Sequence, residues 1–384
     1  MPQRRYELRA EELNQRIEAL IGAAELQYGD GAAVSGPAGA EHVRQMLVTS
    51  LRLLRDGAGL GDLRMVNNAL KELRHAFRVF APYSDLRKVA VFGSARTKPG
   101  SPDWEQAFRF SERIVESGWM VITGAGGGIM KAAQGGAGRD ASFGVNIRLP
   151  FEQKANDVIA GDPKCINFRH FFTRKVVFVK ESHAIALFPG GFGTHDEALE
   201  ALTLMQTGKG EMLPVVFVDE PGGSYWREWS EWVATHMAAG GFLSPEDMNL
   251  FKVTDDVDVA IREISNFYSN YHSSRYVGDE LVLRVREAPD RETLEALNQE
   301  FKGILKQGVI SVHDSLPREN GELPELKRVA LHFDRRSHGV LRLLIDRLNE
   351  LVTVGESTPR GALPHEILSI AMSERAEKEE QAED

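Results

Sequence analysis

The sequence contains one cysteine, Cys165, among its 384 residues. The chain therefore cannot form an internal disulfide, and so little cysteine is typical of reducing compartments, so we expect a cytoplasmic protein. CxxC and HExxH motifs are absent, and the 11 histidines show no ligand spacing. These absences exclude the common zinc patterns, and we expect no bound metal.

Long apolar runs and a basic excess are also missing. No apolar stretch approaches the roughly 20 residues that cross a bilayer. The start, Met1-Pro-Gln-Arg-Arg5, is charged with no apolar segment behind it, so we expect neither a membrane span nor a secretory leader. The net charge of −10 excludes a general nucleic-acid binder, which would be basic. A small anionic ligand remains compatible with it.

Two glycine-rich patterns that bind nucleotide cofactors, G-x-G-x-x-G and the Walker A loop, are matched only in part. In Gly124-Ala-Gly-Gly-Gly-Ile129 an isoleucine occupies the last glycine position of G-x-G-x-x-G, and Gly208-Lys209 is followed by Gly210 rather than by Ser or Thr. The first departure disfavours a dinucleotide cofactor, and the second excludes a Walker A loop. We therefore expect no cofactor.

The composition, 42% hydrophobic and 27% charged residues, is that of an ordinary globular protein with two or three folding units. Residues 1–82 show helical periodicity and predict an N-terminal helical extension. Residues 83–272 alternate strand and helix patterns, and residues 273–353 predict a small α+β domain of order β-α-β-β-α. The charged segment 354–384 is expected to be a solvated tail.

The middle segment predicts an α/β fold. Five short apolar runs alternate with helical patterns, at residues 89–92, 120–123, 143–147, 184–188 and 214–218. This alternation is typical of a Rossmann-like, doubly wound parallel sheet. Several runs are apolar throughout, as expected for strands covered on both faces.

Three glycine-bearing turns follow the first, second and fourth of these strands. The first holds Ser94 and Arg96, the second holds Gly126, Gly127 and Gly128 ahead of Met130, and the third is Pro189–Thr194. Because ligands of open parallel sheets bind beyond the carboxyl ends of the strands, the three turns together indicate a nucleotide-sized site. In the alternative interpretation each glycine only permits a tight turn.

The third turn, Pro189-Gly-Gly-Phe-Gly-Thr194, opens a helical pattern. Its bare amides at the positive end of a helix suit a phosphate, which makes Gly190, Gly191, Gly193 and Thr194 candidate ligand-binding residues. Glu197 follows one turn into the helix. A phosphate does not require a carboxylate there, whereas a reaction that builds positive charge on a sugar does. Alternatively, Thr194 and Glu197 form a capping box that only satisfies backbone donors.

Arg174-Lys175 interrupts an otherwise apolar helical pattern that immediately precedes the fourth strand. Two interpretations are equally supported by the residues. The pair faces the same crevice as the glycine turns, or it consists of surface side chains whose charged ends reach solvent.

Taken together, the PGGxGTxxE stretch at 189–197, the turn Gly126-Gly-Gly-Ile-Met130 and the Arg174-Lys175 pair resemble the LOG ("lonely guy") family. These nucleoside 5′-monophosphate phosphoribohydrolases were formerly labelled lysine decarboxylases. The resemblance covers about residues 88–263. Where short members read M-H-x-R-K, this chain has Phe171-Phe-Thr-Arg-Lys175, which is more similar to the longer bacterial members.

The resemblance implies a homodimeric hydrolase of purine metabolism that cleaves AMP or a related nucleotide to a free base and ribose 5-phosphate. It implies that Glu197 and Arg174 are catalytic and that Lys175 and the three turns bind the substrate. The flanking segments are either a regulatory unit on which a nucleotide effector acts or only extra packing surface for a dimer. A non-catalytic nucleotide or cofactor carrier of the same fold is the alternative, since fold alone does not fix function.

Overall fold

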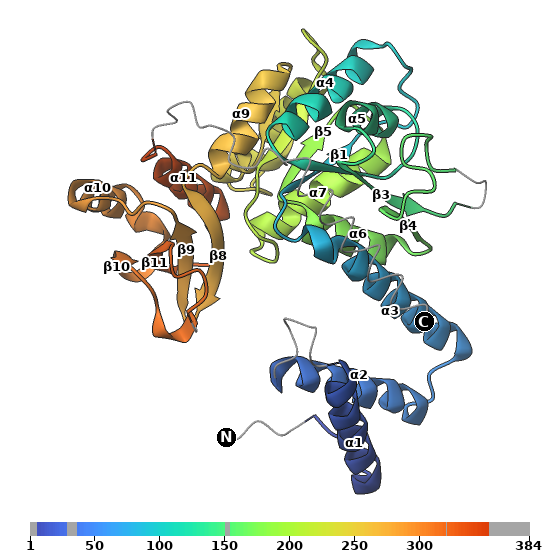
Figure 1. The fold of residues 1–384 in the computed structure, drawn as a ribbon. Coiled ribbons are helices and arrows are strands. Elements are labelled where there is room, and N and C mark those ends of the chain that lie inside the picture. Colours follow the sequence, from blue (N-terminus) through green and yellow to red (C-terminus); the bar gives the residue numbers. More distant parts are fainter. Residues whose placement is uncertain (1–5, 29–36, 150–153, 320, 353–384) are drawn as a thin grey trace. The chain divides into compact units, whose positions relative to one another are not determined.

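The computed structural model describes residues 6–28, 37–149, 154–319 and 321–352 (Figure 1). The chain divides into two compact units, residues 1–72 and 73–384, and the predicted tail 354–384 lies outside the described residues. Within the described ranges no helix is long and apolar enough to cross a membrane. No cluster of His, Cys, Asp and Glu in those ranges could hold a metal ion.

The first unit is helical in its described residues, and the N-terminal extension 1–82 as a domain stays a prediction. Its helices are α1 (Glu11–Tyr28), α2 (Pro37–Arg55) and the first part of α3 (Leu60–Phe80). A small core of Ile17, Ile21 and Val48 joins α1 to α2. The end of α3 belongs to the second unit, where Phe80 stacks on Phe143 at a ring-centroid distance of 4.3 Å.

A seven-stranded parallel sheet forms the centre of the second unit, with strand order β4-β3-β2-β1-β5-β6-β7. The strands are β1 (Lys88–Phe92), β2 (Met120–Thr123), β3 (Ser142–Ile147), β4 (Cys165–Phe168), β5 (Ala184–Leu187), β6 (Val215–Val218) and β7 (Lys252–Thr254). The predicted Rossmann-like α/β fold is confirmed. The sequence did not reveal β4 and β7, because these edge strands are partly exposed and lack a continuous apolar run.

Helices cover both faces of this sheet, which explains why β1, β2, β3, β5 and β6 are buried at every position. Figure 1 shows α4, α5 and α9 on one face and α6 and α7 on the other. Their bounds are α4 (Pro102–Glu116), α5 (Ile129–Ala137), α6 (Phe171–Glu181), α7 (Phe192–Gln206) and α9 (Val257–Phe267). After β6 the chain forms α8 (Tyr225–Trp232), the π-helical turn η3 (Val233–Ala238) and the 3-10 helix η4 (Pro245–Leu250).

The strand order reverses beside β1. The chain runs outward from β1 through β2 and β3 to β4, then crosses back so that β5 pairs with the other side of β1. At such a switch point the connections leave β1 and β5 in opposite directions and open a crevice beyond their carboxyl ends. Two of the three predicted glycine turns border this crevice.

A second, antiparallel sheet of order β10-β11-β9-β8 follows. It consists of β8 (Tyr271–Val277), β9 (Glu280–Val285), β10 (Leu305–His313) and β11 (Lys327–Phe333), with α10 (Arg291–Glu300) and α11 (His338–Asn349). The predicted order β-α-β-β-α therefore lacked β8. Its sequence, YHSSRYV, gives no apolar run because it is a half-exposed edge strand. The division into domains 83–272 and 273–353 stays a prediction, and β8 begins at that boundary.

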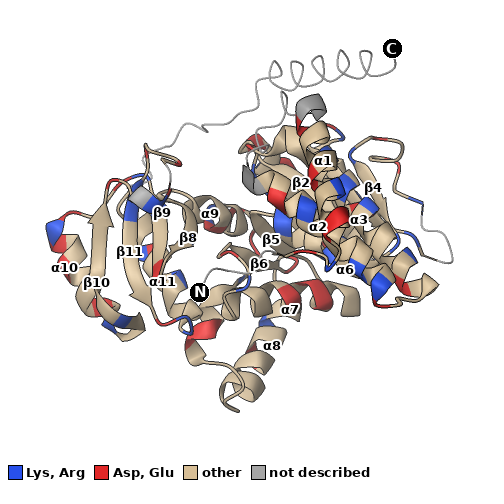
Figure 2. Cartoon of the chain, turned by 90° about the horizontal axis from the view of Figure 1, so that it is seen from below, with Lys and Arg blue, Asp and Glu red and all other residues tan. Residues whose placement is uncertain are grey.

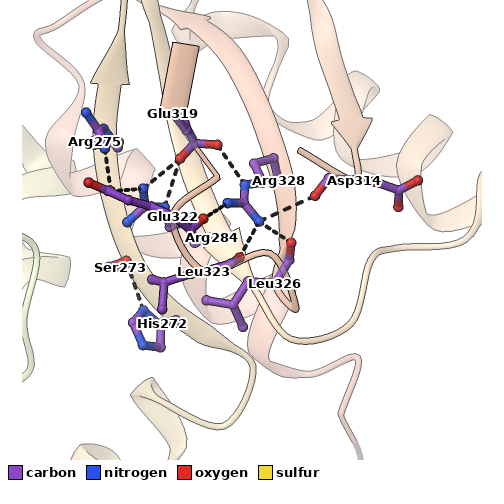
Figure 3. A network of polar contacts seen from close by, with 10 residues as sticks. All are labelled: His272, Ser273, Arg275, Arg284, Asp314, Glu319, Glu322, Leu323, Leu326 and Arg328. Atoms are coloured by element: carbon purple, nitrogen blue, oxygen red, sulfur yellow. Dashed lines mark hydrogen bonds and ion pairs between the residues drawn. The ribbon is translucent and has the colours of Figure 1, made fainter. Parts of the chain in front are cut away.

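A buried ion network ties the loop between β10 and β11 to this sheet (Figure 3). Both carboxylate oxygens of Glu319 accept hydrogen bonds, from Arg284 at 2.7 Å and from Arg328 at 2.7 Å. Arg328 is fully buried and also donates to the carbonyl oxygens of Glu322 and Leu323, at 2.5 and 2.9 Å. Because every charge in the network has a partner, its burial is tolerated.

Candidate functional site

A cavity of about 910 Å³ lies at the carboxyl ends of β1 and β5. Nine of the residues singled out from the sequence line it: Ser94, Arg96, Met130, Arg174, Gly190, Gly191, Gly193, Thr194 and Glu197. Four others, Gly126, Gly127, Gly128 and Lys175, are not part of the lining. The volume suits a mononucleotide, since small-molecule sites measure about 300–1,000 Å³.

The loop after β5 is held by its carbonyl oxygens. The oxygen of Pro189 accepts from the N–H of Ser94 at 3.1 Å, that of Gly190 from the hydroxyl of Tyr225 at 2.6 Å, and that of Gly191 from the N–H of Thr194 at 3.0 Å. By contrast, the N–H groups of residues 191–193 donate to no acceptor among the described residues. They lie at the start of α7, where the helix dipole is positive, and are free to bind an anion.

The capping-box interpretation of Thr194 and Glu197 is wrong. The residue that caps α7 is Gly191, and no side chain makes a capping hydrogen bond there. Thr194 and Glu197 instead lie inside the helix, both buried. Their side chains therefore have a role other than satisfying the helix terminus.

Glu197 is 8% exposed and lines the cavity. Burial raises the pKa of its carboxyl group, while the positive charges of Lys175 and Arg174 oppose that shift. The nearest of these charges, Lys175 Nζ, is 3.6 Å from Glu197 Oε2. The carboxylate makes no hydrogen bond to another described residue, so its oxygens are available to a ligand or water molecule.

Lys175 points along α7 and not into the cavity. Its ammonium group is 2.5 Å from Glu200 and 3.0 Å from Asp196. Burial lowers the pKa of Lys175, but the hydrogen bonds to these two carboxylates raise it above its ordinary value. Figure 2 shows the setting: α7 bears acidic residues and α6 mostly basic ones. Lys175 therefore acts on Glu197 through its charge and is not part of the cavity lining.

Arg174 reaches the cavity, so the interpretation as a surface side chain does not hold. Its Nε donates to the carbonyl oxygen of Val145 at 2.9 Å, and its guanidinium lies 5.1 Å from the ring centroid of Phe178. Burial lowers the pKa of Arg174, and the charge of Glu197 opposes that shift. The guanidinium is thus a fixed positive charge in the same cavity as the carboxylate of Glu197.

The second glycine turn, at residues 126–128, packs against the first turn, which holds Ser94. Gly128 has a φ of +58°, and a Cβ atom there would lie 2.2 Å from the carbonyl oxygen of Ser94. That oxygen also accepts from the N–H of Ile129 at 3.0 Å. The carbonyl of Gly126 is bound by Asn156 at 2.8 Å. These glycines therefore allow the turn to pack behind Ser94, and of this segment only Met130 reaches the cavity.

The sequence did not point to several lining residues, among them Tyr225, Phe171 and Phe192. Tyr225 starts α8, just after β6, the neighbour of β5 in the sheet. The rule that selected the glycine turns, proximity to the carboxyl end of a central strand, also applies to it. It went unnoticed because the turn between β6 and α8 carries no phosphate-loop pattern.

Comparison with known proteins was consistent with these motifs. Residues 127–264 match a family model described as "Possible lysine decarboxylase". The chain is 32% identical over 129 residues to the "Probable cytokinin riboside 5'-monophosphate phosphoribohydrolase LOGL5" of Oryza sativa subsp. japonica, a match that spans 32% of this chain and half of that protein. It is 24% identical over 220 residues to the "Cytokinin riboside 5'-monophosphate phosphoribohydrolase LOG7" of Arabidopsis thaliana, covering 56% of this chain and 97% of the relative. The resemblance to LOG proteins is thereby confirmed.

Two solved structures are similar to about half of the chain. A molybdenum cofactor binding protein of Rippkaea orientalis matches 47% of this chain and 94% of its own, with 20% identity and a TM-score of 0.32. The molybdenum cofactor carrier protein of Chlamydomonas reinhardtii matches 47% and 96%, with 22% identity and a TM-score of 0.31.

Proposed function

We propose that this protein hydrolyses the N-glycosidic bond of nucleoside 5′-monophosphates, AMP among them, to a free base and ribose 5-phosphate. One observation carries the proposal. A single cavity contains three features: loop amides that donate to no acceptor among the described residues, a buried carboxylate without a hydrogen-bond partner among those residues, and a fixed guanidinium. An anion site needs only the first of these, whereas cleavage of a nucleotide uses all three.

The loop amides bind the 5′-phosphate in this proposal. The N–H groups of residues 191–193 and the positive end of α7 favour a dianionic group, and Arg96 adds an exposed positive charge at the cavity. Anchoring the phosphate at the start of α7 holds the ribose beside the beginning of the helix. Glu197 follows about one turn further along.

Cleavage of the bond between C1′ and the base nitrogen passes through a ribosyl cation, as in other glycoside hydrolysis. Glu197 stabilises this cation and takes a proton from the attacking water, whose oxygen bonds to C1′. The bonding electrons leave with the base, and the proton taken from water passes to the base nitrogen, which leaves Glu197 ionised again. Arg174 holds the substrate and stabilises the negative charge that develops on the departing base.

A homodimer is part of the proposal. Several apolar side chains of α6 and α7 are exposed: Phe171, Phe172, Val176, Phe192 and Leu199. Phe171 and Phe192 also line the cavity. The most exposed is Phe192, at 97%. Such a group of apolar side chains on one surface is typical of an interface, and a second copy of the chain is the partner that the resemblance implies.

The direct test is an assay with AMP, GMP, CMP and UMP. We expect release of ribose 5-phosphate from at least one of them in the absence of added metal or cofactor, measured by chromatography of base and sugar phosphate. Tight binding of a nucleotide without release of ribose 5-phosphate would instead identify a carrier.

The pH dependence should shift when Lys175 is replaced by methionine. Glu197 acts as a carboxylate, so activity is lost as the pH falls through its pKa. The variant lacks an ammonium group that lowers this pKa, so the acidic limb of the kcat/KM profile should move to higher pH, by about one pH unit. Lys180→Met, which removes an exposed ammonium group from the same helix, is the control and should leave the limb in place. A limb unaffected by either change would contradict the role assigned to Lys175.

A further inference from the structure

Tyr225 is firmly anchored at the edge of the cavity. The buried carboxylate of Asp219, directly after β6, accepts from the N–H of Trp226 at 3.0 Å. The Trp226 side chain is fully buried, with its ring centroid 4.6 Å from that of Phe217. The backbone at the start of α8 is therefore fixed to the end of β6, and Tyr225 extends from a rigid base.

The hydroxyl of Tyr225 donates a hydrogen bond of 2.6 Å to the carbonyl oxygen of Gly190. A Cβ atom on Gly190 would lie 2.2 Å from Thr194 Oγ1 and 2.9 Å from the backbone nitrogen of Ser94. Only a glycine fits between these neighbours. The loop is therefore well packed on one side and held by a single side-chain hydroxyl at the Gly190 carbonyl.

The peptide between Gly190 and Gly191 is intrinsically easy to rotate, because neither flanking residue has a Cβ atom. In a planar trans peptide the N–H points opposite to the C=O, and the described chain has no cis peptide bond. Fixing the Gly190 carbonyl toward Tyr225 consequently fixes the Gly191 N–H in the opposite direction. That N–H is one of the three donors at the start of α7 without an acceptor among the described residues.

We propose that Tyr225 is a positioning residue that locks the Gly190–Gly191 peptide and thereby sets the affinity of the site for ligands with a terminal phosphate monoester. The inference rests on the proposed function, since it assigns the loop to the 5′-phosphate. It assigns Tyr225 no contact with the reacting atoms. Removal of the hydroxyl weakens binding of nucleotides and ribose 5-phosphate and leaves phosphate-free nucleosides unaffected.

The experiment compares wild type, Tyr225→Phe and the control Tyr276→Phe, which alters a similarly exposed tyrosine in the second sheet. Calorimetric titration with ribose 5-phosphate should give a Kd about three- to tenfold higher for Tyr225→Phe, the effect of one hydrogen bond. Adenosine should bind all three proteins equally. With AMP as substrate, KM should rise by the same factor while kcat stays within about twofold. The thermal midpoint should fall by no more than about 4 °C, the effect of one lost hydrogen bond.

An unchanged Kd for ribose 5-phosphate would overturn the inference. An equal loss of adenosine binding, or a thermal midpoint lowered by more than about 8 °C, would also overturn it, because either would indicate a general distortion of the fold. The titration needs no turnover and so separates the two proposals. If wild type binds ribose 5-phosphate but does not cleave nucleotides, the proposed hydrolase function is wrong. The comparison with Tyr225→Phe still tests whether Tyr225 positions the Gly190–Gly191 peptide. If wild type does not bind ribose 5-phosphate, the inference on Tyr225 fails, and the assay with AMP decides the hydrolase separately.

Discussion

Replacement of Glu197 by glutamine is expected to lower kcat for AMP by about 100- to 10,000-fold, the range that a positioned carboxylate contributes as a general base. Glutamine has nearly the same shape, so the phosphate loop should remain intact and the KM should change little. The measurement is steady-state release of ribose 5-phosphate, combined with titration of AMP into the inactive variant. Turnover near the wild-type rate would reduce Glu197 to a buried residue without a role in the chemistry.

The stability of the same variant provides a second readout. Burial raises the pKa of Glu197, so the ionised form is disfavoured in the folded state and this contribution to stability is lost as the pH rises through that pKa. Glutamine carries no charge, and Glu197→Gln should therefore unfold at pH 7 no more easily than wild type. The matched control is Glu200→Gln, one turn further along α7, which also faces Lys175 and should retain activity.

Arg174→Ala is expected to reduce kcat/KM for AMP by about 100- to 1,000-fold, comparable to removal of a preorganised donor from other active sites. The guanidinium occupies the cavity as a fixed charge, and alanine leaves no group to hold the substrate or stabilise the departing base. The fold should persist, because the change removes a single hydrogen bond, to the carbonyl of Val145, whose loss costs about 1–3 kcal/mol. Circular dichroism with a thermal melt checks this alongside the kinetics.

Arg174→Lys separates charge from geometry. Lysine keeps a positive charge but lacks the planar set of donors, so we expect activity between those of Arg174→Ala and wild type. If the alanine variant is folded and fully active, Arg174 is not part of the catalytic machinery. If the alanine variant unfolds, the lysine variant is the one to test, and full activity there would show that a positive charge suffices at this position without the planar donors of arginine.

The sequence revealed the interior of the fold more readily than its edges. The central strands are covered on both faces, so each shows as a continuous apolar run whatever its neighbours are. The edge strands β4, β7 and β8 are partly exposed and have no such run. Their strand character comes from hydrogen bonding to an existing strand, which is information that the local sequence does not contain.

In the candidate site, too, some features followed from local sequence and others depended on packing. The glycine turn at 189–193 was recognisable because local residues determine a helix start and its free amides. The spacing of residues left two questions open. One was whether Thr194 and Glu197 form a capping box, and the other was whether Arg174 faces solvent or the crevice. The structure answered both, because a residue's surroundings depend on the elements that pack against it.

The strand and helix alternation, the three glycine turns and the residue types available for chemistry can be read from the sequence, since they follow from local periodicity and backbone freedom. Which side chains meet depends instead on the tertiary fold. The reversal of strand order beside β1 brings the turn after β5 next to the turn after β1, and the packing of α6 against α7 directs Lys175 to the acids. Folding likewise buried Glu197 and placed Tyr225 behind Gly190. Contacts between residues far apart in the chain arise from sheet topology, and no local pattern encodes them.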